Sequence, residues 1–357
     1  MLNDPRPTYL KVHLPAILSN YQYFKQRMHP KTVIPVVKAD AYGHGAIEVV
    51  GALYDEGVTL FAVSLVEEAL ELREHFEDIE ILLMGPTHPS ALSIVSEHNL
   101  MVTVYDQGMI EAIKHLNHPL RVHLKVDTGM HRLGFLSDAV LEAYEALKKM
   151  PHVTIEGIYT HFAGAEHDDA QYHAQRQMFH HILRQIDCPP SVHAANTEAS
   201  LNDEQHDPFT THVRIGLGLY GACQEPHKHP LNPTLTWHTK VASIKTIPKG
   251  AKVGYSGTYQ ANTEETIALL PVGYADGLWR THQDQVVSIN QKTYPIVGRI
   301  SMDQTTIRVD HTVKENDEVL LLGGHQTSIY DFASRTNTIP YEIFTNLSKR
   351  VPRYHIK

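Results

Sequence analysis

The sequence predicts an α/β protein. An N-terminal (β/α)8 TIM-like barrel is expected over residues 10–225, and a mostly-β domain over residues 226–357 that also takes in residues 1–9. In the first part, short runs of β-branched and apolar residues alternate with longer amphipathic segments. After residue 225, strand-like segments dominate. Eight strand–helix units in about 200 residues are typical of a closed parallel barrel, whereas a doubly wound open sheet is the rival interpretation.

Eight segments are candidates for the barrel strands. They are residues 33–38, 61–65, 79–85, 101–105, 121–127, 153–162, 191–196 and 212–221. These segments are apolar along much of their length, as burial on both faces of a parallel sheet requires. Most are followed by a helical pattern, such as the one over residues 66–76, although the seventh is followed only by a short helical segment.

The second domain begins after a proline-rich linker at residues 226–233. Its candidate strands occupy residues 235–247, 266–277, 286–291, 294–309 and 317–323, and helical patterns return only at residues 328–336 and 341–349. The N-terminal segment 8–14 precedes the first barrel helix, predicted over residues 16–28, and is a candidate strand of this domain.

Composition excludes several classes of protein. The chain of 357 residues has 42% hydrophobic and 20% charged residues, as soluble globular proteins do, and its net charge of −9 argues against a nucleic-acid partner. We see no signal peptide and no apolar run long enough to cross a membrane, and two cysteines make a disulfide framework unexpected, so a cytoplasmic protein is expected. Histidine occurs 26 times, but no HExxH motif is present and no metal site is expected.

Polar side chains gather at the carboxyl ends of the predicted strands, where barrel enzymes place their chemistry. In chain order they are Lys38 and Tyr42, then Lys125, Asp127 and Arg132, then His161, then His193, Asn196 and Thr197, and finally Arg214 with Gly216 and Gly218. One such residue alone is usually a solvated side chain, a turn or a helix cap. Several strand ends that face one mouth predict an active site instead.

A lysine in a half-buried mouth can lose its proton easily enough to form a Schiff base, and the obvious carbonyl partner is the aldehyde of pyridoxal 5'-phosphate. Tyr42, Thr197 and the amides around Gly216 are candidates to hold the phosphate. Arg214 is a candidate to face the pyridine nitrogen. Because arginine only donates hydrogen bonds and stays charged, it would disfavour protonation of that nitrogen and weaken the cofactor as an electron sink.

These motifs closely resemble those of the alanine racemases, the fold-type III pyridoxal-phosphate enzymes, over nearly the whole chain. The matching stretches occur in the family's order and include VVKADAYGHG (36–45), KVDTGMHRLGF (125–135), HAANTEAS (193–200), VRIGLGLYG (213–221), VGYSGTY (253–259), PVGYADG (271–277), VGRISMDQ (297–304) and RVPRY (350–354). The first of these matches the family's lysine motif at almost every position.

The resemblance implies two catalytic bases. Lys38 would carry the cofactor and serve as one base, while Tyr255, from the second subunit of a homodimer, would be the other. Bases on opposite faces of the substrate α-carbon are what inversion of configuration needs. A phenol has a reference pKa of about 10, so Tyr255 needs a positive neighbour, and His161 and Arg214 are the family's candidates.

The resemblance also implies the residues that bind the ligands. Arg132 would contact the cofactor's phenolic oxygen and the substrate carboxylate, and Lys125 matches a lysine that is carbamylated in many members and orients that arginine. The main-chain amide of Met302, again from the second subunit, would bind the substrate carboxylate, and Tyr274 and Asp303 would line a narrow access channel. The phosphate would be surrounded by Tyr42, Asn196, Thr197, Gly216, Leu217 and Tyr341.

Four positions depart from the family pattern. His131 stands where glycine is usual, Thr197 replaces a common serine, Ser256 follows the tyrosine base where glycine is frequent, and Ser301 stands where cysteine is common. None of these departures removes a catalytic group. His131 lies next to Arg132, so the breadth of substrates is less determined than the chemistry.

The leading hypothesis is therefore a racemase that interconverts L- and D-alanine and supplies D-alanine for peptidoglycan. A serine racemase or a broad-spectrum racemase of the same family is the alternative. A fold-type III amino-acid decarboxylase is disfavoured, because decarboxylation calls for a carboxylate rather than Arg214 at the pyridine nitrogen. A non-enzymatic pyridoxal-phosphate carrier would resemble the barrel alone.

Overall fold

The computed structural model describes residues 6–165, 169–202, 207–324 and 326–357. The chain folds into two compact units. The β unit consists of Met1–Ala16, Tyr42–Gly45 and Pro233–Lys357, and the barrel unit consists of Ile17–Ala41 and Ala46–Asn232. No helix formed by the described residues is long and apolar enough to span a membrane.

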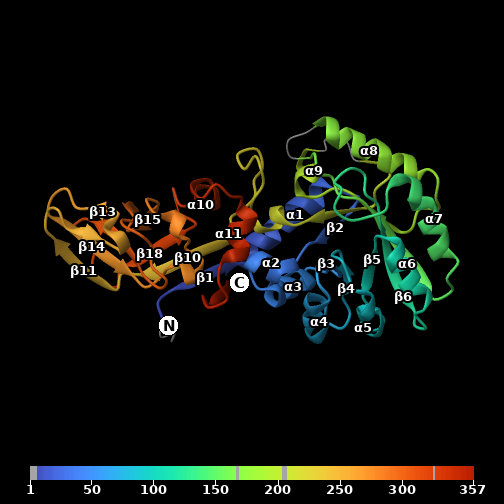
Figure 1. The fold of residues 1–357 in the computed structure, drawn as a ribbon, viewed down its shortest axis with the longest axis horizontal. Helices are drawn as coiled ribbons and strands as arrows, with labels where there is room; N and C mark the ends of the chain where they lie inside the picture. The colour runs from blue at the N-terminus through green and yellow to red at the C-terminus, as the bar shows by residue number, and fades with distance from the viewer. Residues whose placement is uncertain (1–5, 166–168, 203–206, 325) are drawn as a thin grey trace. The chain divides into compact units, whose positions relative to one another are not determined.

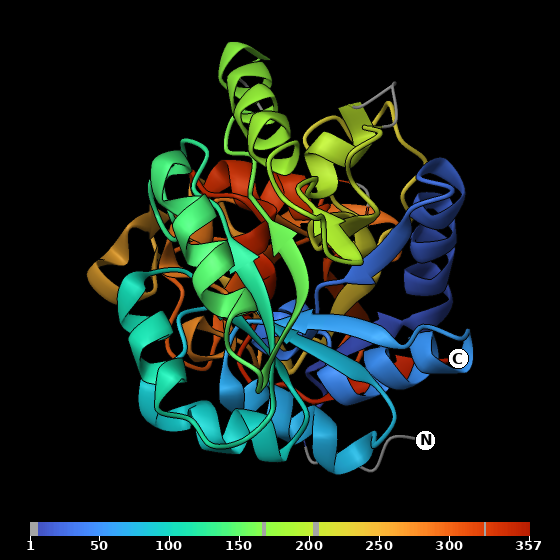
Figure 2. The same cartoon turned by 90° about the vertical axis from the view of Figure 1, so that its right-hand side faces the viewer.

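The barrel unit contains an eight-stranded parallel sheet (Figures 1 and 2). The strands are β2 (Thr32–Pro35), β3 (Leu60–Val63), β4 (Glu80–Leu83), β5 (Met101–Val104), β6 (Leu120–Lys125), β7 (Val153–Tyr159), β8 (Ser191–His193) and β9 (His212–Ile215). They are hydrogen-bonded in the order β2-β9-β8-β7-β6-β5-β4-β3. Val36 bridges to Ala62, and the N–H of Val37 donates to the carbonyl of Ala62 at 2.9 Å, which links the two ends of the sheet. The predicted fold class is confirmed.

Helices follow the barrel strands and surround the sheet (Figure 2). They are α1 (Leu14–Arg27), α2 (Lys38–Gly43), α3 (Ala46–Asp55), α4 (Val66–His75), α5 (Leu92–Glu97), α6 (Gln107–Lys114), α7 (Ser137–Lys148), α8 (Asp169–Leu183) and α9 (Thr197–Asn202), with the 3-10 turns η1 (Pro89–Ala91) and η2 (Leu217–Tyr220). Side chains on the outer face of the strands pack against these helices and those on the inner face fill the barrel, so neighbours such as Ile81, Leu82 and Leu83 of β4 are all fully buried.

The β unit contains three sheets, of six, three and two strands, in the orders β16-β15-β18-β10-β1-β19, β11-β14-β17 and β12-β13. The strands are β1 (Tyr9–His13), β10 (Leu235–Lys240), β11 (Ser243–Ile247), β12 (Lys252–Val253), β13 (Tyr259–Gln260), β14 (Glu265–Leu270), β15 (Val286–Ile289), β16 (Lys292–Pro295), β17 (Thr305–Val309), β18 (Glu318–Leu322) and β19 (Arg353–Ile356). The N-terminal strand β1 lies between β10 and β19, antiparallel to the first and parallel to the second.

Short helical turns connect the strands of the β unit. They are η3 (Tyr255–Gly257), η4 (Tyr274–Asp276), η5 (Arg280–His282), α10 (Ile329–Arg335) and α11 (Pro340–Asn346). Three of these segments, η3, η4 and α11, carry tyrosines that the sequence assigns to the active site.

Candidate active site

Lys38 begins a left-handed turn rather than ending a strand. The strand predicted over residues 33–38 stops at Pro35, and the four residues Ala39–Tyr42 of α2 have φ between 50° and 55°. Left-handed backbone costs roughly 1–2 kcal/mol for each residue with a side chain, so this turn has to be held by its surroundings. The glycine that follows is also required, because a Cβ on Gly43 would lie 2.4 Å from the carbonyl oxygen of Phe344.

Two carboxylates hold the turn. Glu68 of α4 accepts the N–H of Ala39 at 2.6 Å with one oxygen, and the N–H groups of Ser64 (2.8 Å) and Leu65 (3.0 Å) with the other. Asp40 accepts the N–H of Ala46 at 2.8 Å. Glu68 thus joins the loops after β2 and β3, a role that sequence reasoning missed. Its only sequence signal is its position three residues after the N-cap of α4, where a glutamate usually caps its own helix.

The amine of Lys38 lies in positive surroundings. Burial lowers its pKa most, Arg132 and Arg214 lower it further, and Glu68 opposes them by raising it. These charges act on Lys38 from three other strand–helix units, so the barrel brings together the lysine and two arginines that the sequence placed at separate strand ends. A partly buried lysine with a lowered pKa gives up its proton more readily than an ordinary lysine, which makes it a better candidate for a nucleophile and a base.

Arg214 is held rigidly inside the barrel. It is 3% exposed, and its guanidinium donates to Nδ1 of His193 at 2.7 Å. It also donates to the carbonyls of Thr160 and Ala194, each at 2.9 Å, and to Nδ1 of His161 at 3.2 Å. Burial lowers its pKa to about 10, so the group remains positive at neutral pH. The structure therefore brings His161 and Arg214 into contact.

Two buried histidines extend this contact into the barrel core. Because a guanidinium only donates, Nδ1 of His193 carries no proton, and its Nε2–H donates to Nδ1 of His123 at 2.9 Å. Tyr159 stacks on His193 with ring centroids 4.6 Å apart. A Cβ on Gly157 would lie 2.3 Å from the His123 ring, so only glycine leaves room for it. His123 was missed because it lies within an otherwise apolar strand.

Both histidines are neutral near pH 7. Burial lowers the pKa of His123 to about 3 and that of His193 well below its usual value, with neighbouring positive charges adding to both shifts. A guanidinium can only donate hydrogen bonds, so the histidine that accepts one from it must have an unprotonated ring nitrogen, as a neutral ring does. The pair therefore orients Arg214 without adding charge to the site.

The depressed pKa of His123 predicts a loss of stability in mild acid. Below pH 6.5 the unfolded chain takes up a proton at this residue and the folded chain does not, so the free energy of unfolding falls by about 1.4 kcal/mol per pH unit as pH drops from 6.5 toward 3. In His123→Gln, which cannot titrate, this part of the slope should vanish. Urea unfolding from pH 6.5 to 5 measures it. The exposed His311→Gln should keep the wild-type slope, and an unchanged slope in His123→Gln would show that His123 charges in the fold.

Lys125 ends β6 as a buried side chain. Its amine donates to the carbonyl of Val126 at 3.2 Å and lies 4.8 Å from the ring centroid of Tyr159. Burial lowers its pKa well below the usual value, and Arg214 adds to the shift while Asp127 opposes it. Burial thus favours the uncharged form of the amine, which repels the nearby arginines less than the charged form would.

The loop from Asp127 to Arg132 is shaped by one carboxylate. Asp127 accepts the N–H groups of Gly129, Met130 and His131 at 3.0–3.1 Å through a single oxygen. These hydrogen bonds hold the pKa of Asp127 low although burial raises it. His131 has φ of 54°, which explains why glycine is usual at this position, and its exposed ring has Nδ1 3.6 Å from the other oxygen of Asp127.

The cationic side chains of the barrel mouth have no acidic partners in the described ranges. Within residues 6–165, 169–202, 207–324 and 326–357, no carboxylate forms an ion pair with Lys38, Arg132 or Arg214. Arg214 is the buried one of the three, and buried positive charge without a counterion is unfavourable. The site therefore fits an anionic ligand such as a phosphate or a carboxylate.

The predicted phosphate segment lies at the ends of β8 and β9. Thr197 accepts the N–H of Gly218 at 3.2 Å, and Asn196 caps α9 by accepting the N–H of Ala199 at 3.0 Å. A Cβ on Gly218 would lie 2.5 Å from the ring of Phe24, so the backbone of η2 requires glycine here. Gly216 and Leu217 begin this turn. The structure thus brings Thr197 next to the glycine-rich segment that the sequence assigned to phosphate binding.

The remaining candidate residues belong to the β unit. Tyr42 and Tyr341 have ring centroids 6.0 Å apart, and burial raises the pKa of Tyr42, so its phenol stays protonated. Tyr255 is 70% exposed in the single chain, and Tyr274 and Met302 are 40% and 53% exposed.

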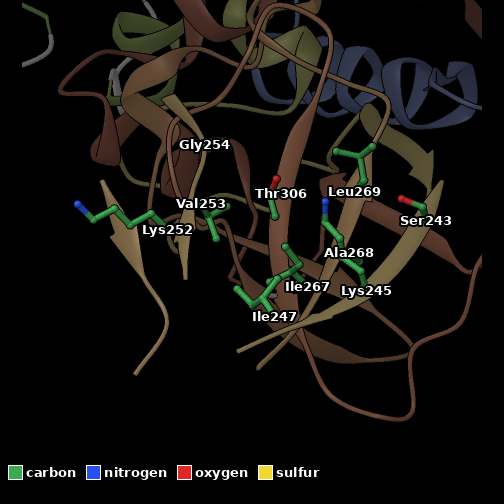
Figure 3. A pocket seen from close by; sticks show the side chains of 10 residues that line it. All are labelled: Ser243, Lys245, Ile247, Lys252, Val253, Gly254, Ile267, Ala268, Leu269 and Thr306. Carbon is green, nitrogen blue, oxygen red and sulfur yellow. The ribbon is translucent and has the colours of Figure 1, made fainter. Parts of the chain in front are cut away.

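The turn that carries Tyr255 is strained. Gly254 and Ser256 have φ of 72° and 61°, and Ser256 accepts a hydrogen bond from Arg299 at 3.2 Å. The left-handed backbone of Ser256 explains why glycine is frequent at this position. A cavity of about 190 Å³ lies beside this turn and is lined by Val253, Gly254 and strands β11, β14 and β17 (Figure 3).

Known proteins resemble this chain along nearly its whole length. The profile of the alanine racemase N-terminal domain matches residues 12–224, and that of the C-terminal domain matches residues 234–355. The alanine racemase of Staphylococcus epidermidis is 35% identical over 364 residues, covering 98% of this chain and 95% of the relative. That of Staphylococcus carnosus is 37% identical over 366 residues with the same coverage.

Solved structures are similar over the full length. The alanine racemase from E. faecalis superposes with a TM-score of 0.95 at 34% identity, covering 100% of both chains. That from Bacillus anthracis with bound L-Ala-P has a TM-score of 0.93 at 33% identity, covering 100% of this chain and 96% of that one. Sequence and fold agree along nearly the whole length, and the chain belongs to the alanine racemase family.

Proposed function

We propose that the protein is a pyridoxal-phosphate-dependent racemase that interconverts L- and D-alanine through two bases, Lys38 and Tyr255. The observation that carries the proposal is the partly buried Lys38 with its lowered pKa, close enough to Arg132 and Arg214 to be influenced by both at the mouth of the barrel. Membership of the alanine racemase family supports alanine as the substrate. The physiological role proposed is the supply of D-alanine for peptidoglycan in the cytoplasm.

Pyridoxal phosphate, when bound, supplies a conjugated ring that stabilises negative charge at the substrate α-carbon. Lys38 would hold it covalently through the side-chain amine. The uncompensated positive charge of the mouth and the glycine-rich turn η2 fit its phosphate. The proposed phosphate ligands are Asn196, Thr197, Gly216 and Leu217 of the barrel unit, with Tyr42 and Tyr341 of the β unit.

Arg214 would face the ring nitrogen of the cofactor. Its four hydrogen bonds fix its position, and a pKa of about 10 keeps it charged at neutral pH. A permanent positive charge there disfavours a proton on the ring nitrogen and limits how much negative charge the ring takes up. This argues against the fold-type III decarboxylases, which call for a carboxylate at that position.

Arg132 would bind the cofactor's phenolic oxygen and the substrate carboxylate, and Lys125 would orient it. In its uncharged form, which burial favours, the amine of Lys125 can add carbon dioxide and lose a proton, which gives a negatively charged carbamate. A carbamate would attract Arg132, whereas a protonated Lys125 would repel it. We propose this modification of Lys125 for that reason.

Inversion of configuration needs a proton donor and a proton acceptor on opposite sides of the α-carbon. Lys38 would act on one side, and the partner's Tyr255 on the other. His161, held by Arg214, is proposed to lie beside that phenol. Burial lowers the pKa of His161 well below its usual value, so the ring is neutral, and the positive charge that favours the phenolate would come from Arg214.

A homodimer with shared sites follows from this assignment. Tyr255, Tyr274 and Met302 are exposed in the single chain, which is expected of residues that act in a second subunit. The main-chain amide of Met302 would bind the substrate carboxylate, and Tyr274 and Asp303 would line the access channel. A serine or broad-spectrum racemase would use the same residues with a wider channel. The division of the chain at residues 9/10 and 225/226 remains part of this proposal.

Mixing two inactive variants tests the shared sites. Lys38→Ala and Tyr255→Ala homodimers should each be inactive, but a mixed dimer holds one site with an intact Lys38 and an intact Tyr255. Equal mixing should restore about a quarter of wild-type racemisation, because half of the dimers are mixed and each has one intact site of two. Subunit exchange is verified with two affinity tags. Verified exchange without any recovered activity would contradict the shared-site assignment.

A further inference from the structure

Asp276 is a fully buried carboxylate in the β unit. Its side chain is 0% exposed and accepts hydrogen bonds from both terminal nitrogens of Arg6, one of them at 2.7 Å. Nε of Arg350 lies 3.1 Å from the same carboxylate, and the N–H of Gly273 donates to it at 2.9 Å. A buried charge is stable only when it is paired and hydrogen-bonded as completely as this one.

The turn that contains Asp276 is joined directly to the loop of Met302. The N–H of Tyr274 donates to the carbonyl of Ser301, and the N–H of Ala275 donates to the carbonyl of Met302, each at 3.0 Å. The two segments touch so closely that a Cβ on Gly273 would lie 2.2 Å from the oxygen of Ser301. The position of η4 therefore fixes the position of Met302.

Arg350 links the same carboxylate to the far side of the Met302 loop. Its guanidinium donates to Asp303 at 2.7 Å while its Nε faces Asp276. The backbone of Asp276 is tied in as well, because its carbonyl accepts the N–H of Ser348 at 3.0 Å. Arg6 completes the assembly by donating to the carbonyl of Pro271. Segments from both ends of the chain thus converge on Asp276.

We propose that Asp276 is the positioning residue of the substrate-carboxylate subsite. Its charge sets the place of Tyr274 and of the main-chain amide of Met302, and through them it acts on alanine that is bound at the other subunit's barrel. This rests on the proposed function with shared sites. Tyr274 and Met302 are proposed to act beside Lys38 of the other subunit, so the effect of Asp276 should pass from one subunit to the other.

The first test is Asp276→Asn, which keeps the shape of the side chain and removes its charge. Two guanidiniums would then compete for one neutral oxygen, and η4 should shift with the Met302 loop. Loss of a charged hydrogen bond predicts a KM for alanine raised about 10-fold or more, with a smaller change in kcat. Asp310→Asn removes a surface ion pair with Lys292 in the same unit and is the matched control, with an unchanged KM.

The second test asks which subunit carries the defect. When Asp276→Asn is paired with Lys38→Ala and the doubly tagged mixed dimer is purified, the only active barrel takes its Met302 loop from the chain with an intact Asp276. The KM should therefore return to the wild-type value. The converse pair combines a Tyr255→Ala chain with a chain that carries both Lys38→Ala and Asp276→Asn. The active barrel then belongs to the Tyr255→Ala chain and takes its Met302 loop from the chain with Asp276→Asn, so the KM should stay raised.

The two pairs separate the explanations. In both pairs, KM could instead depend on residue 276 of the chain that provides the active barrel. Asp276 would then act within its own subunit, and the proposal would be wrong although the shared sites stand. If Lys38→Ala and Tyr255→Ala never complement, the shared sites fail and this proposal fails with them. Should Asp276→Asn not fold, Arg350→Gln removes one of the two guanidiniums paired with Asp276, together with the link to Asp303, while Arg6 stays in place, and it should raise KM by a smaller factor. An unchanged KM in Arg350→Gln would then overturn the proposal.

Discussion

Replacing Lys38 by alanine should reduce alanine racemisation by at least about 10³-fold, because the variant loses both the covalent attachment of the cofactor and one of the two bases. The amine of Lys38 cannot be replaced from elsewhere in the turn. Lys38 is the first residue of α2. The four left-handed residues that follow it, Ala39 to Tyr42, have no side-chain amine. Racemase activity measured with added pyridoxal phosphate tests this expectation.

A second readout distinguishes loss of the base from loss of folding. Borohydride reduction should fix the cofactor to the wild-type protein, and peptide mass spectrometry should locate the adduct at Lys38. The Lys38→Ala protein should give no such adduct while its thermal unfolding stays cooperative. Lys149→Ala, at an exposed position after α7, should match the wild type in both measurements. Wild-type activity in Lys38→Ala, or an adduct on another lysine, would refute the assignment.

Replacing Tyr255 by phenylalanine should separate racemisation from hydrogen exchange. The change removes only the hydroxyl, so one of the two proton transfers is lost and racemisation should fall about 10²- to 10⁴-fold. Lys38 remains, and the α-hydrogen of one enantiomer should still exchange with D2O. The other enantiomer should not exchange, because its α-hydrogen points to the side from which the phenol is missing.

Mass spectrometry of L- and D-alanine incubated separately in D2O measures this difference. Tyr259→Phe removes the hydroxyl of a nearby tyrosine that is bonded to Glu265 and Arg308, and it should leave exchange of both enantiomers unchanged. If Tyr255→Phe slowed exchange of both enantiomers equally, a single base would serve both faces and the two-base assignment would be wrong.

The barrel could be predicted from the sequence because its pattern is local. Alternation of apolar strands with amphipathic segments requires no knowledge of distant contacts, and all eight strands are found where it placed them. The carboxyl ends predicted for the strands lie beyond the ends found in the structure. The strand expected to run to Lys38 stops at Pro35, because the residues that follow turn left-handed to present the lysine.

The features that sequence reasoning missed depend on contacts between distant segments. Glu68 holds the lysine turn from the next strand–helix unit, His123 reaches Arg214 through His193, and Asp276 is paired with arginines near the two ends of the chain. None of the three has a local signature. Glu68 resembles an ordinary helix cap, His123 lies in an apolar strand, and Asp276 belongs to a turn. Only the folded chain shows that each supports a residue of the site.

The most direct test of the central claim is formation of D-alanine from L-alanine by the purified protein with pyridoxal phosphate, measured beside L-serine, L-lysine and L-ornithine. Fast turnover of alanine, with little of the other three, is the predicted result. Preferred racemisation of serine would keep the two bases and shift attention to His131 and the access channel. Release of carbon dioxide from lysine or ornithine without racemisation of alanine would contradict the account.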